Sequence, residues 1–203
     1  MLQKLQQIDL QLMIFFNRKL ENSIFDTIMP WLRESIFWAP LYLYMIAWGL
    51  MNLGKKGIWW VAWAVATIAL SDQVSSGLIK NTVARIRPCR NPEVLSYIQL
   101  RLENCSGAYS FTSSHAANHF ALAMYVFMSL GPVIGTRITR WLFVWAAAIC
   151  YAQVYVGVHY PFDVLGGTLV GLGCGYITAR LYLVKAKALD LKLIKSKNPK
   201  NPI

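Results

Sequence analysis

Long stretches without a charged side chain constrain the fold of this chain more than any other feature. Hydrophobic residues make up 56% of the 203 residues and charged residues only 14%, whereas about 25% of a typical soluble chain is charged. A helix that crosses a membrane needs about 20 mainly apolar residues. Suitable stretches are 36–53, 58–79, 120–134 with the turn before it, 138–158 and 164–184. We therefore predict an all-α integral membrane protein, a bundle of five transmembrane helices.

The first 35 residues differ from these stretches, because charged side chains such as Asp9, Arg18 and Asp26 interrupt the apolar positions. We predict that residues 1–35 form an amphipathic helix in the membrane interface, followed by a turn that ends near Pro30. A sixth, poorly hydrophobic span is the alternative. The start of the chain has no continuous apolar core and no small-residue cleavage site, so we expect no cleaved signal peptide.

A single domain is expected, since no linker, internal repeat or low-complexity tract is visible. After the N-terminal helix it comprises a transmembrane core (36–184) and a basic tail (185–203). Short loops rich in lysine and arginine tend to stay in the cytoplasm. Two such turns, 54–57 and 135–140, fall on the same side as the tail. We therefore predict a multi-pass protein of the bacterial inner (cytoplasmic) membrane with these segments in the cytoplasm.

Three polar segments, 80–88, 111–120 and 151–163, then lie together on the opposite side, facing the periplasm or exterior. They contain the cations, hydroxyls, histidines and carboxylate that can cleave a phosphate ester without a metal. Basic residues on this outer side break the usual charge rule, and a phosphate ligand would account for them: Lys80, Arg85, Arg87, Arg90 and Arg101. The net charge of +11 does not indicate nucleic acid, because the basic residues are divided between two membrane faces.

In the first segment, Lys80 and Arg87 are seven residues apart. On a helix they would project from nearly the same face, two turns from one another, and Pro88 would end that helix. Such a pair can bind an anion. The alternative is a basic rim whose side chains snorkel at the end of a span.

In the second segment, three hydroxyl residues precede an apolar helical run. Ser113 or Ser114 can cap this helix, whose free amides then point at an anion, with His115 beside it in the first turn. The alternative is an ordinary serine cap next to an unrelated histidine. His119 lies on the same face and could complete a metal pair with His115. Because no carboxylate stands nearby, we expect no metal and assign His119 to packing.

In the third segment, His159 directly precedes a helix that starts with proline, and Asp163 follows four residues later. A carboxylate that fixes one ring nitrogen leaves the other as a directed nucleophile or base. A satisfied polar pair at the membrane rim is the alternative. Gln153, a neutral side chain, stands six residues before His159.

The four cysteines divide by location. Cys150 and Cys174 lie in spans and are expected to act as small apolar residues. Cys89 and Cys105 bracket the outer loop, in what would be an oxidising compartment. A disulfide between them would close a loop of about 17 residues and stabilise the fold by about 3 kcal/mol; two free thiols are the alternative.

Two features bear on helix packing. Gly167, Gly171 and Gly175 follow one face of the last span and permit close helix contact in lipid. Asp72 lies inside the second span, where we expect it to form a structural hydrogen bond between helices.

The three polar segments resemble the motifs of the type 2 phosphatidic-acid phosphatase family of membrane lipid phosphatases, which shares its core with the vanadium haloperoxidases. The first family motif is lysine, six residues, arginine and proline, and it is matched in full by Lys80, Arg87 and Pro88. The second is proline-serine-glycine-histidine. Here it reads threonine-serine-serine-histidine, so that Ser113 and His115 match.

The third motif is serine-arginine, five residues, histidine, three residues and aspartate. His159 and Asp163 match it, but alanine and Gln153 replace the serine and arginine. The resemblance covers about residues 36–184. It implies a helical membrane enzyme of the hydrolase class that needs no cofactor.

By that resemblance, His159 attacks phosphorus to form a phosphohistidine, Asp163 orients it, and His115 protonates the departing group. Water then attacks the phosphohistidine while His115 accepts a proton. The groups expected around the phosphoryl oxygens are Lys80, Arg87, Ser113, Ser114 and Gln153.

Gln153 is the departure that matters, because a lost guanidinium removes charge-assisted hydrogen bonds worth about 1.5–3 kcal/mol each. Arg85 or Arg90 can take its place, or the substrate needs only a neutral donor there. A third alternative is a weak or inactive relative that binds or translocates lipid phosphate. We expect activity, because the remaining motif residues are present.

A site at the outer rim of the membrane suits a lipid whose phosphate lies at the headgroup level. We expect undecaprenyl diphosphate first, cleaved to undecaprenyl phosphate, followed by lipid A phosphates, phosphatidylglycerol phosphate and phosphatidic acid. The expected partners are this lipid and the bilayer, with no nucleic acid. The sequence does not indicate an oligomeric state.

Overall fold

The computed structural model describes residues 2–105 and 107–197. These residues form helices, and the β contact among them is one isolated antiparallel bridge between Ile86 and Tyr109. The all-α class predicted from the sequence is confirmed. Part of the predicted basic tail belongs to the last helix, and residues 198–203 lie outside the described part of the chain.

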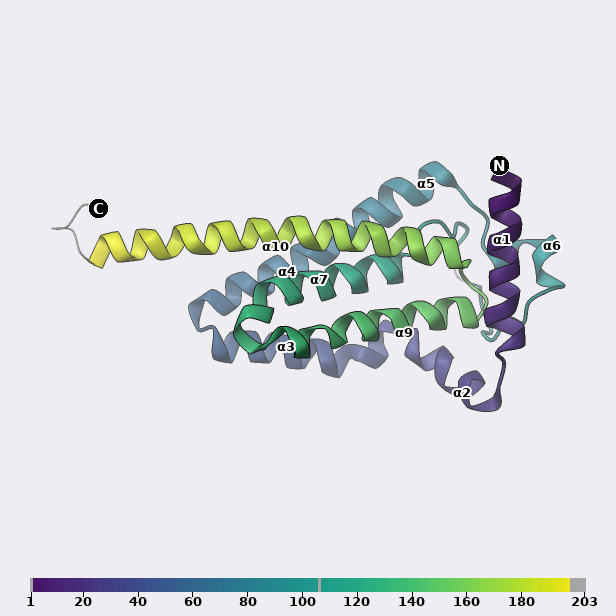
Figure 1. Ribbon diagram of the computed structural model, residues 1–203, viewed down its shortest axis with the longest axis horizontal. Helices are drawn as coiled ribbons and strands as arrows, with labels where there is room; N and C mark the ends of the chain where they lie inside the picture. Colours follow the sequence, from purple (N-terminus) through teal and green to yellow (C-terminus); the bar gives the residue numbers. More distant parts are fainter. Residues whose placement is uncertain (1, 106, 198–203) are drawn as a thin grey trace.

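The long helices run side by side along the longest axis of the molecule (Figure 1). Their bounds are α3 (Ala39–Asn52), α4 (Lys55–Asp72), α7 (Ser114–Ile134), α9 (Trp141–Tyr155) and α10 (Pro161–Lys197). Helix α4 continues through a π-helical turn (Gln73–Ile79) into the short helix α5 (Lys80–Val83). The larger part of each apolar stretch identified in the sequence therefore lies in one of these helices.

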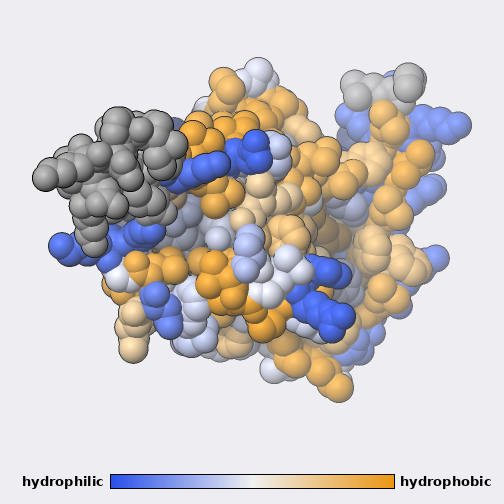
Figure 2. All heavy atoms as spheres, turned by 60° about the vertical axis from the view of Figure 1, so that its left-hand side comes forward, coloured by the Kyte–Doolittle hydropathy of each residue, from blue (hydrophilic) through white to orange (hydrophobic). Residues whose placement is uncertain are grey.

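Two of the described helices are long and apolar enough to cross a membrane by themselves, namely α7 and the Pro161–Lys187 part of α10. Large apolar side chains are also exposed on other helices, including Leu43 (65%) and Val65 (60%). In Figure 2, orange apolar side chains cover much of the visible face, and hydrophilic ones form separate blue patches. An exposed apolar surface of this extent is typical of contact with lipid or protein. Five spans remain the prediction.

The N-terminal segment forms two helices rather than one. Helix α1 (Leu2–Ile14) lies across the end of the bundle, and α2 (Ser23–Leu32) follows after a π-helical turn (Figure 1). Thirteen residues rise about 20 Å, well short of the roughly 30 Å of a bilayer core. This arrangement favours an interfacial helix over a sixth span.

The predicted turn near Pro30 was wrong, because α2 runs through this proline to Leu32. Asn22 caps the start of α2 by accepting a hydrogen bond from the backbone N–H of Phe25. Met29 and Phe25 pack against a buried cluster around Tyr155 of α9. This apolar packing holds the helix in place although the proline lacks an amide donor.

Helices α7 and α10 approach closely along the glycine face predicted from the sequence, which is therefore confirmed. A Cβ atom on Gly167 would collide with the carbonyl oxygen of Ser113, and Gly171 and Gly175 face carbonyls further along α7 in the same way. The contact brings the N-terminal ends of both helices together. There, the backbone N–H of Ser113 donates to the carbonyl of Asp163 over 2.9 Å.

Asp72 links α4 to α7, as expected of a polar residue inside a span. Its Oδ1 accepts hydrogen bonds from Asn118 Nδ2 at 3.3 Å and from Ser76 Oγ at 3.1 Å. Both helices thereby keep a fixed register next to the polar end of the bundle.

Candidate active site

The three polar segments meet at one end of the bundle, beside α1 (Figure 1). This end contains the end of α5, the starts of α7 and α10, and the loop after α9. The basic turns between α3 and α4 and between α7 and α9 lie at the other end. The convergence derived from counting five spans is thus present in the structure.

His159 and Asp163 form the centre of this site. His159 is 1% exposed, and its Nδ1 lies 3.6 Å from Oδ2 of Asp163. The buried carboxylate is held by two further groups: Oδ1 pairs with Nη1 of Arg85 at 2.8 Å, and Oδ2 accepts from the N–H of Tyr160 at 2.8 Å. Because Nδ1 faces this fixed carboxylate, Nε2 is the nitrogen available for chemistry.

Burial lowers the pKa of His159 to about 4, and the nearby Asp163 only partly opposes this effect. Burial disfavours the charged imidazolium. His159 is therefore neutral at physiological pH, which is the state that a nucleophile or base requires.

Arg87 lies against the other nitrogen of the His159 ring, with 3.4 Å between Nη1 of Arg87 and Nε2 of His159. The predicted placement of Lys80 and Arg87 on one helix face was wrong. Helix α5 ends at Val83, Ala84 takes a left-handed conformation with φ 48°, and Arg87 is extended. A residue before proline is pushed out of the helical region, and the extended segment is held by Ser110, whose N–H donates to the carbonyl of Arg85 at 2.7 Å.

Lys80 reaches the site from α5 instead. Its Nζ donates to Ser114 Oγ at 2.8 Å, and this hydroxyl also lies 2.6 Å from Ser76 Oγ. Burial, followed by the charge of Arg87, lowers the pKa of Lys80. Two cations held close together inside the protein create a place for an anion.

Ser113 is the N-cap of α7, and its hydroxyl accepts from the N–H of Ala116 at 3.4 Å. His115 follows in the first turn, and it interacts electrostatically with His159. The start of α7 thus brings free amides, Ser114 and His115 to the same place as Lys80. Such a helix end favours negative charge.

His119 stacks beside His115 with 6.2 Å between ring centroids. Its Nδ1 lies 2.7 Å from the carbonyl oxygen of His115, and its Nε2 lies 2.8 Å from the hydroxyl of Tyr42. Both ring nitrogens are therefore engaged by the protein, which agrees with a packing role.

Gln153 is fully buried, and its Nε2 donates to the carbonyl oxygen of Arg33 at 3.5 Å. The two arginines considered as substitutes are engaged elsewhere. Arg85 pairs with carboxylates, and Arg90 donates to the carbonyl of Cys105 at 3.0 Å. Both guanidinium groups are therefore bound to other parts of the protein.

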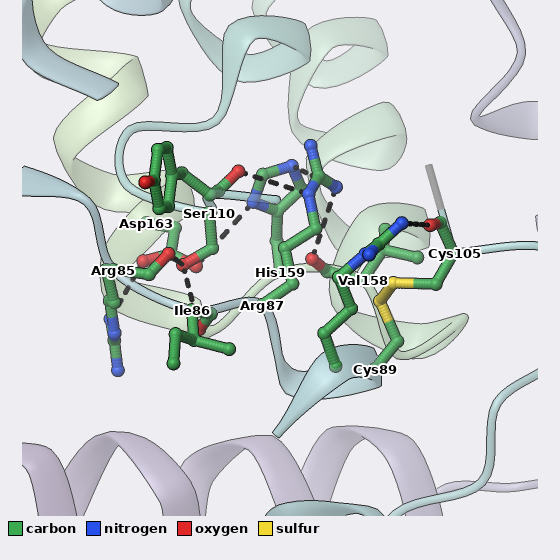
Figure 3. Close-up of a disulfide and its surroundings, with 11 residues drawn as sticks. Arg85, Ile86, Arg87, Cys89, Cys105, Ser110, Val158, His159 and Asp163 are labelled. Atoms are coloured by element: carbon green, nitrogen blue, oxygen red, sulfur yellow. Dashed lines mark hydrogen bonds and ion pairs between the residues drawn. A yellow bond between two sulfur atoms is a disulfide. The ribbon is translucent and has the colours of Figure 1, made fainter. Parts of the chain in front are cut away.

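Cys89 and Cys105 form a disulfide with their Cα atoms 6.0 Å apart. Figure 3 shows this disulfide to one side of His159 and the Asp163–Arg85 pair to the other. Arg87 comes two residues before Cys89, so the disulfide fixes the loop that carries this cation.

Sequence reasoning overlooked two residues, Asp9 and Arg33. Asp9 on α1 is buried, lies 2.7 Å from Nη2 of Arg85, and accepts from the N–H of Phe162 at 2.8 Å. It thereby fastens α1 to the carboxylate that orients His159. For Asp9, the signal available in the sequence was an acidic residue flanked by isoleucine and leucine. For Arg33, it was a further cation on the predicted outer side of the membrane.

Comparisons with known proteins agree with this geometry. Residues 59–187 match the PAP2 superfamily. The lipid A 4'-phosphatase of Bacteroides thetaiotaomicron is 30% identical over 178 residues, covering 84% of this chain and 75% of the relative. The undecaprenyl-diphosphatase of Sulfolobus acidocaldarius is 27% identical over 167 residues, covering 79% of this chain and 70% of the relative.

The fold is also that of a solved membrane phosphatase. The PAP2-type phosphatidylglycerolphosphate phosphatase of Bacillus subtilis superposes with a TM-score of 0.66 at 18% identity, covering 90% of this chain and 87% of the other. At this identity the likeness shows the fold alone. The motifs and the extent of the family match lead to one conclusion: the chain belongs to the PAP2 superfamily of membrane phosphatases.

Proposed function

We propose that this protein hydrolyses a phosphate ester of a membrane lipid through a phosphohistidine on His159. The observation that carries the proposal is the surroundings of the His159 ring. Asp163 lies at Nδ1, and Arg87 lies at Nε2. A phosphoryl group held by Arg87 would therefore sit in front of Nε2, the ring nitrogen that faces away from the carboxylate.

The reaction has two steps. In the first, Nε2 of neutral His159 forms a bond to phosphorus, the bond from phosphorus to the lipid oxygen breaks, and His115 gives this oxygen a proton. Asp163 stabilises the positive charge that develops on the imidazole. In the second, water attacks phosphorus, His115 takes a proton from it, and inorganic phosphate leaves as the N–P bond breaks.

Charge on the phosphoryl oxygens is neutralised by fixed groups. Lys80, Arg87 and the amides at the start of α7 surround the same place, with Ser113 and Ser114 ordering that helix end. Preorganised cations and amides of this kind stabilise a phosphoryl transition state. The chemistry proposed here accordingly uses no metal.

We further propose lipid A as the substrate, ahead of undecaprenyl diphosphate. A cavity of about 350 Å³ opens beside Ser114 and His115. Its lining combines the polar side chains Ser35, Asp72, Asn118 and His119 with the apolar side chains Ile68 and Leu122. Such a mixed lining offers polar partners to the headgroup of a lipid and apolar contact to its chain. The likeness to the lipid A 4'-phosphatase supports this order.

Undecaprenyl diphosphate remains the second substrate, because a relative of similar coverage is named for that activity. For either lipid we propose that the site faces the outside of a bacterial cytoplasmic membrane. The basic turns at the opposite end of the bundle support this orientation.

The test is phosphate release by the purified protein in detergent, with excess chelator, from lipid A, undecaprenyl diphosphate, phosphatidylglycerol phosphate and phosphatidic acid. We expect turnover, highest kcat/KM on lipid A, and inhibition by vanadate. The His159→Ala protein, prepared identically, controls for contaminating phosphatases. Preference for undecaprenyl diphosphate would contradict the proposal that lipid A is the substrate. Binding of these lipids without turnover would instead indicate a lipid-phosphate carrier.

A further inference from the structure

We infer that Arg33, at the end of α2, supplies the phosphoryl-binding cation that the chain lacks at Gln153. Arg33 lies 120 residues before Gln153 in the sequence, but the two are neighbours in the fold. The inference rests on the proposed function only in taking the pocket at His159 to hold a phosphoryl group.

Gln153 holds the backbone of Arg33. Its Nε2 donates to the Arg33 carbonyl at 3.5 Å, while its Oε1 is buried and has no hydrogen-bond partner. A buried polar atom without a partner is costly. An arginine side chain at 153 would have to occupy space next to Arg33. The neutral residue at 153 and the cation at 33 are therefore neighbours in the fold.

One hydrogen-bond donor of Arg33 has no acceptor. Its side chain is 11% exposed, Nη1 pairs with the half-exposed Glu34 at 2.7 Å, and Nε is buried without an acceptor. A buried arginine with a purely structural role would have its donors satisfied by the protein. An oxygen of a phosphoryl group would supply the acceptor that Nε lacks.

Two observations place this end of α2 near the catalytic groups. Ser35, two residues after Arg33, lines the same cavity as Ser114 and His115. The charge of Arg33 also interacts with Arg87, where it adds to the effect of burial in lowering the pKa of Arg87. Two like charges within electrostatic range of one another favour an anion between them.

The other cations of the outer side do not fill this role. Arg85 is bound to Asp9 and Asp163, and Arg90 is bound to the backbone of the disulfide loop. The two substitutes expected from the sequence are thus bound elsewhere, whereas Arg33 lies beside the position where the family motif has arginine.

The first experiment compares wild type with Arg33→Ala, using whichever lipid of the panel is turned over. We expect kcat/KM to fall by about 10²-fold, the size typical of losing one charged donor to a transition state. Arg90→Ala is the matched control and should stay within a few-fold of wild type. Arg33→Lys, which keeps the charge but not the planar fork, should fall between Arg33→Ala and wild type.

Relocating the cation tests the link to position 153. Gln153→Arg alone should bring no gain, because Arg33 already fills the pocket. In the Arg33→Ala background, Gln153→Arg should recover activity at least about tenfold over Arg33→Ala. A purely structural role of Arg33 would not allow this rescue. Equal activities of Arg33→Ala and the double variant, with both proteins melting like wild type, would overturn the inference.

Orthovanadate binding, measured by calorimetry without lipid, separates this inference from the proposed function. Vanadate mimics the phosphoryl group, so wild type should bind it and Arg33→Ala should bind it at least about tenfold more weakly. Equal binding by wild type and Arg33→Ala would refute the role of Arg33 and leave the phosphatase site standing. Failure of wild type to bind would contradict the proposed function itself.

Discussion

At the scale of single residues, the chemistry depends on one histidine kept neutral next to a fixed carboxylate. Asp163 is held by Arg85 and by the N–H of Tyr160, so it does not rely on His159 for its position. The imidazole is then oriented without being charged. This combination gives a nucleophile that is ready at neutral pH.

The first prediction concerns the protonation of His159 in the phosphate-free protein. Its folded pKa is about 4, and its unfolded pKa is about 6.5. The unfolded chain therefore binds this proton first, so the stability contributed by neutral His159 is complete above about pH 6.5 and is lost as the pH falls toward about 4. Imidazole chemical shifts of labelled protein, assigned with His159→Gln, should show no His159 titration above about pH 5.5. A midpoint near 6.5 would contradict the burial argument.

Local spacing predicted some site residues and missed others. The His159–Asp163 pair and the Ser113 cap follow from neighbours within four residues, which a sequence displays directly. Asp9 and Arg33 act on partners more than a hundred residues away. No periodicity reports such a contact, because it depends on how α1 and α2 pack against the end of the bundle.

At the scale of elements, glycine determines how the catalytic helices meet. The face of α10 that carries Gly167 and Gly171 lies against backbone carbonyls of α7. This close approach allows Ser113 to bond to the first turn of α10. The glycine spacing and the helical stretches were readable from the sequence. The break after α5 was not, because helical periodicity continues past Val83 while the proline and the loop contacts end the helix earlier.

The second prediction tests this helix contact. Gly171→Ala places a Cβ against the carbonyl of Ala117, whereas a Cβ at Gly173 meets nothing within 4 Å. Both changes raise helix propensity alike, so their difference isolates the collision. Gly171→Ala should lower stability by about 1–3 kcal/mol and kcat/KM by about 10²-fold through misplacement of the site. Thermal melting and steady-state kinetics provide the measurements. Equal melting temperatures and equal kcat/KM for the two variants would show that the contact between α7 and α10 can accommodate a Cβ atom at Gly171.

At the scale of the whole molecule, an apolar flank separates two polar ends of different kind. One end carries basic turns, and the other carries the site with α1 lying across it (Figure 1). Counting apolar stretches in the sequence is sufficient to predict that the three polar segments lie together. The position of α1 was beyond such counting, since it depends on contacts between distant residues such as the ion pair between Asp9 and Arg85.

The central claim is that His159 becomes phosphorylated, and rapid-quench trapping of the enzyme with phosphate-labelled substrate tests it most directly. We predict a transient label that is labile to acid, stable to alkali and mapped to His159, with none on His159→Ala. Turnover without a labelled enzyme, or a label on another residue, would contradict the account.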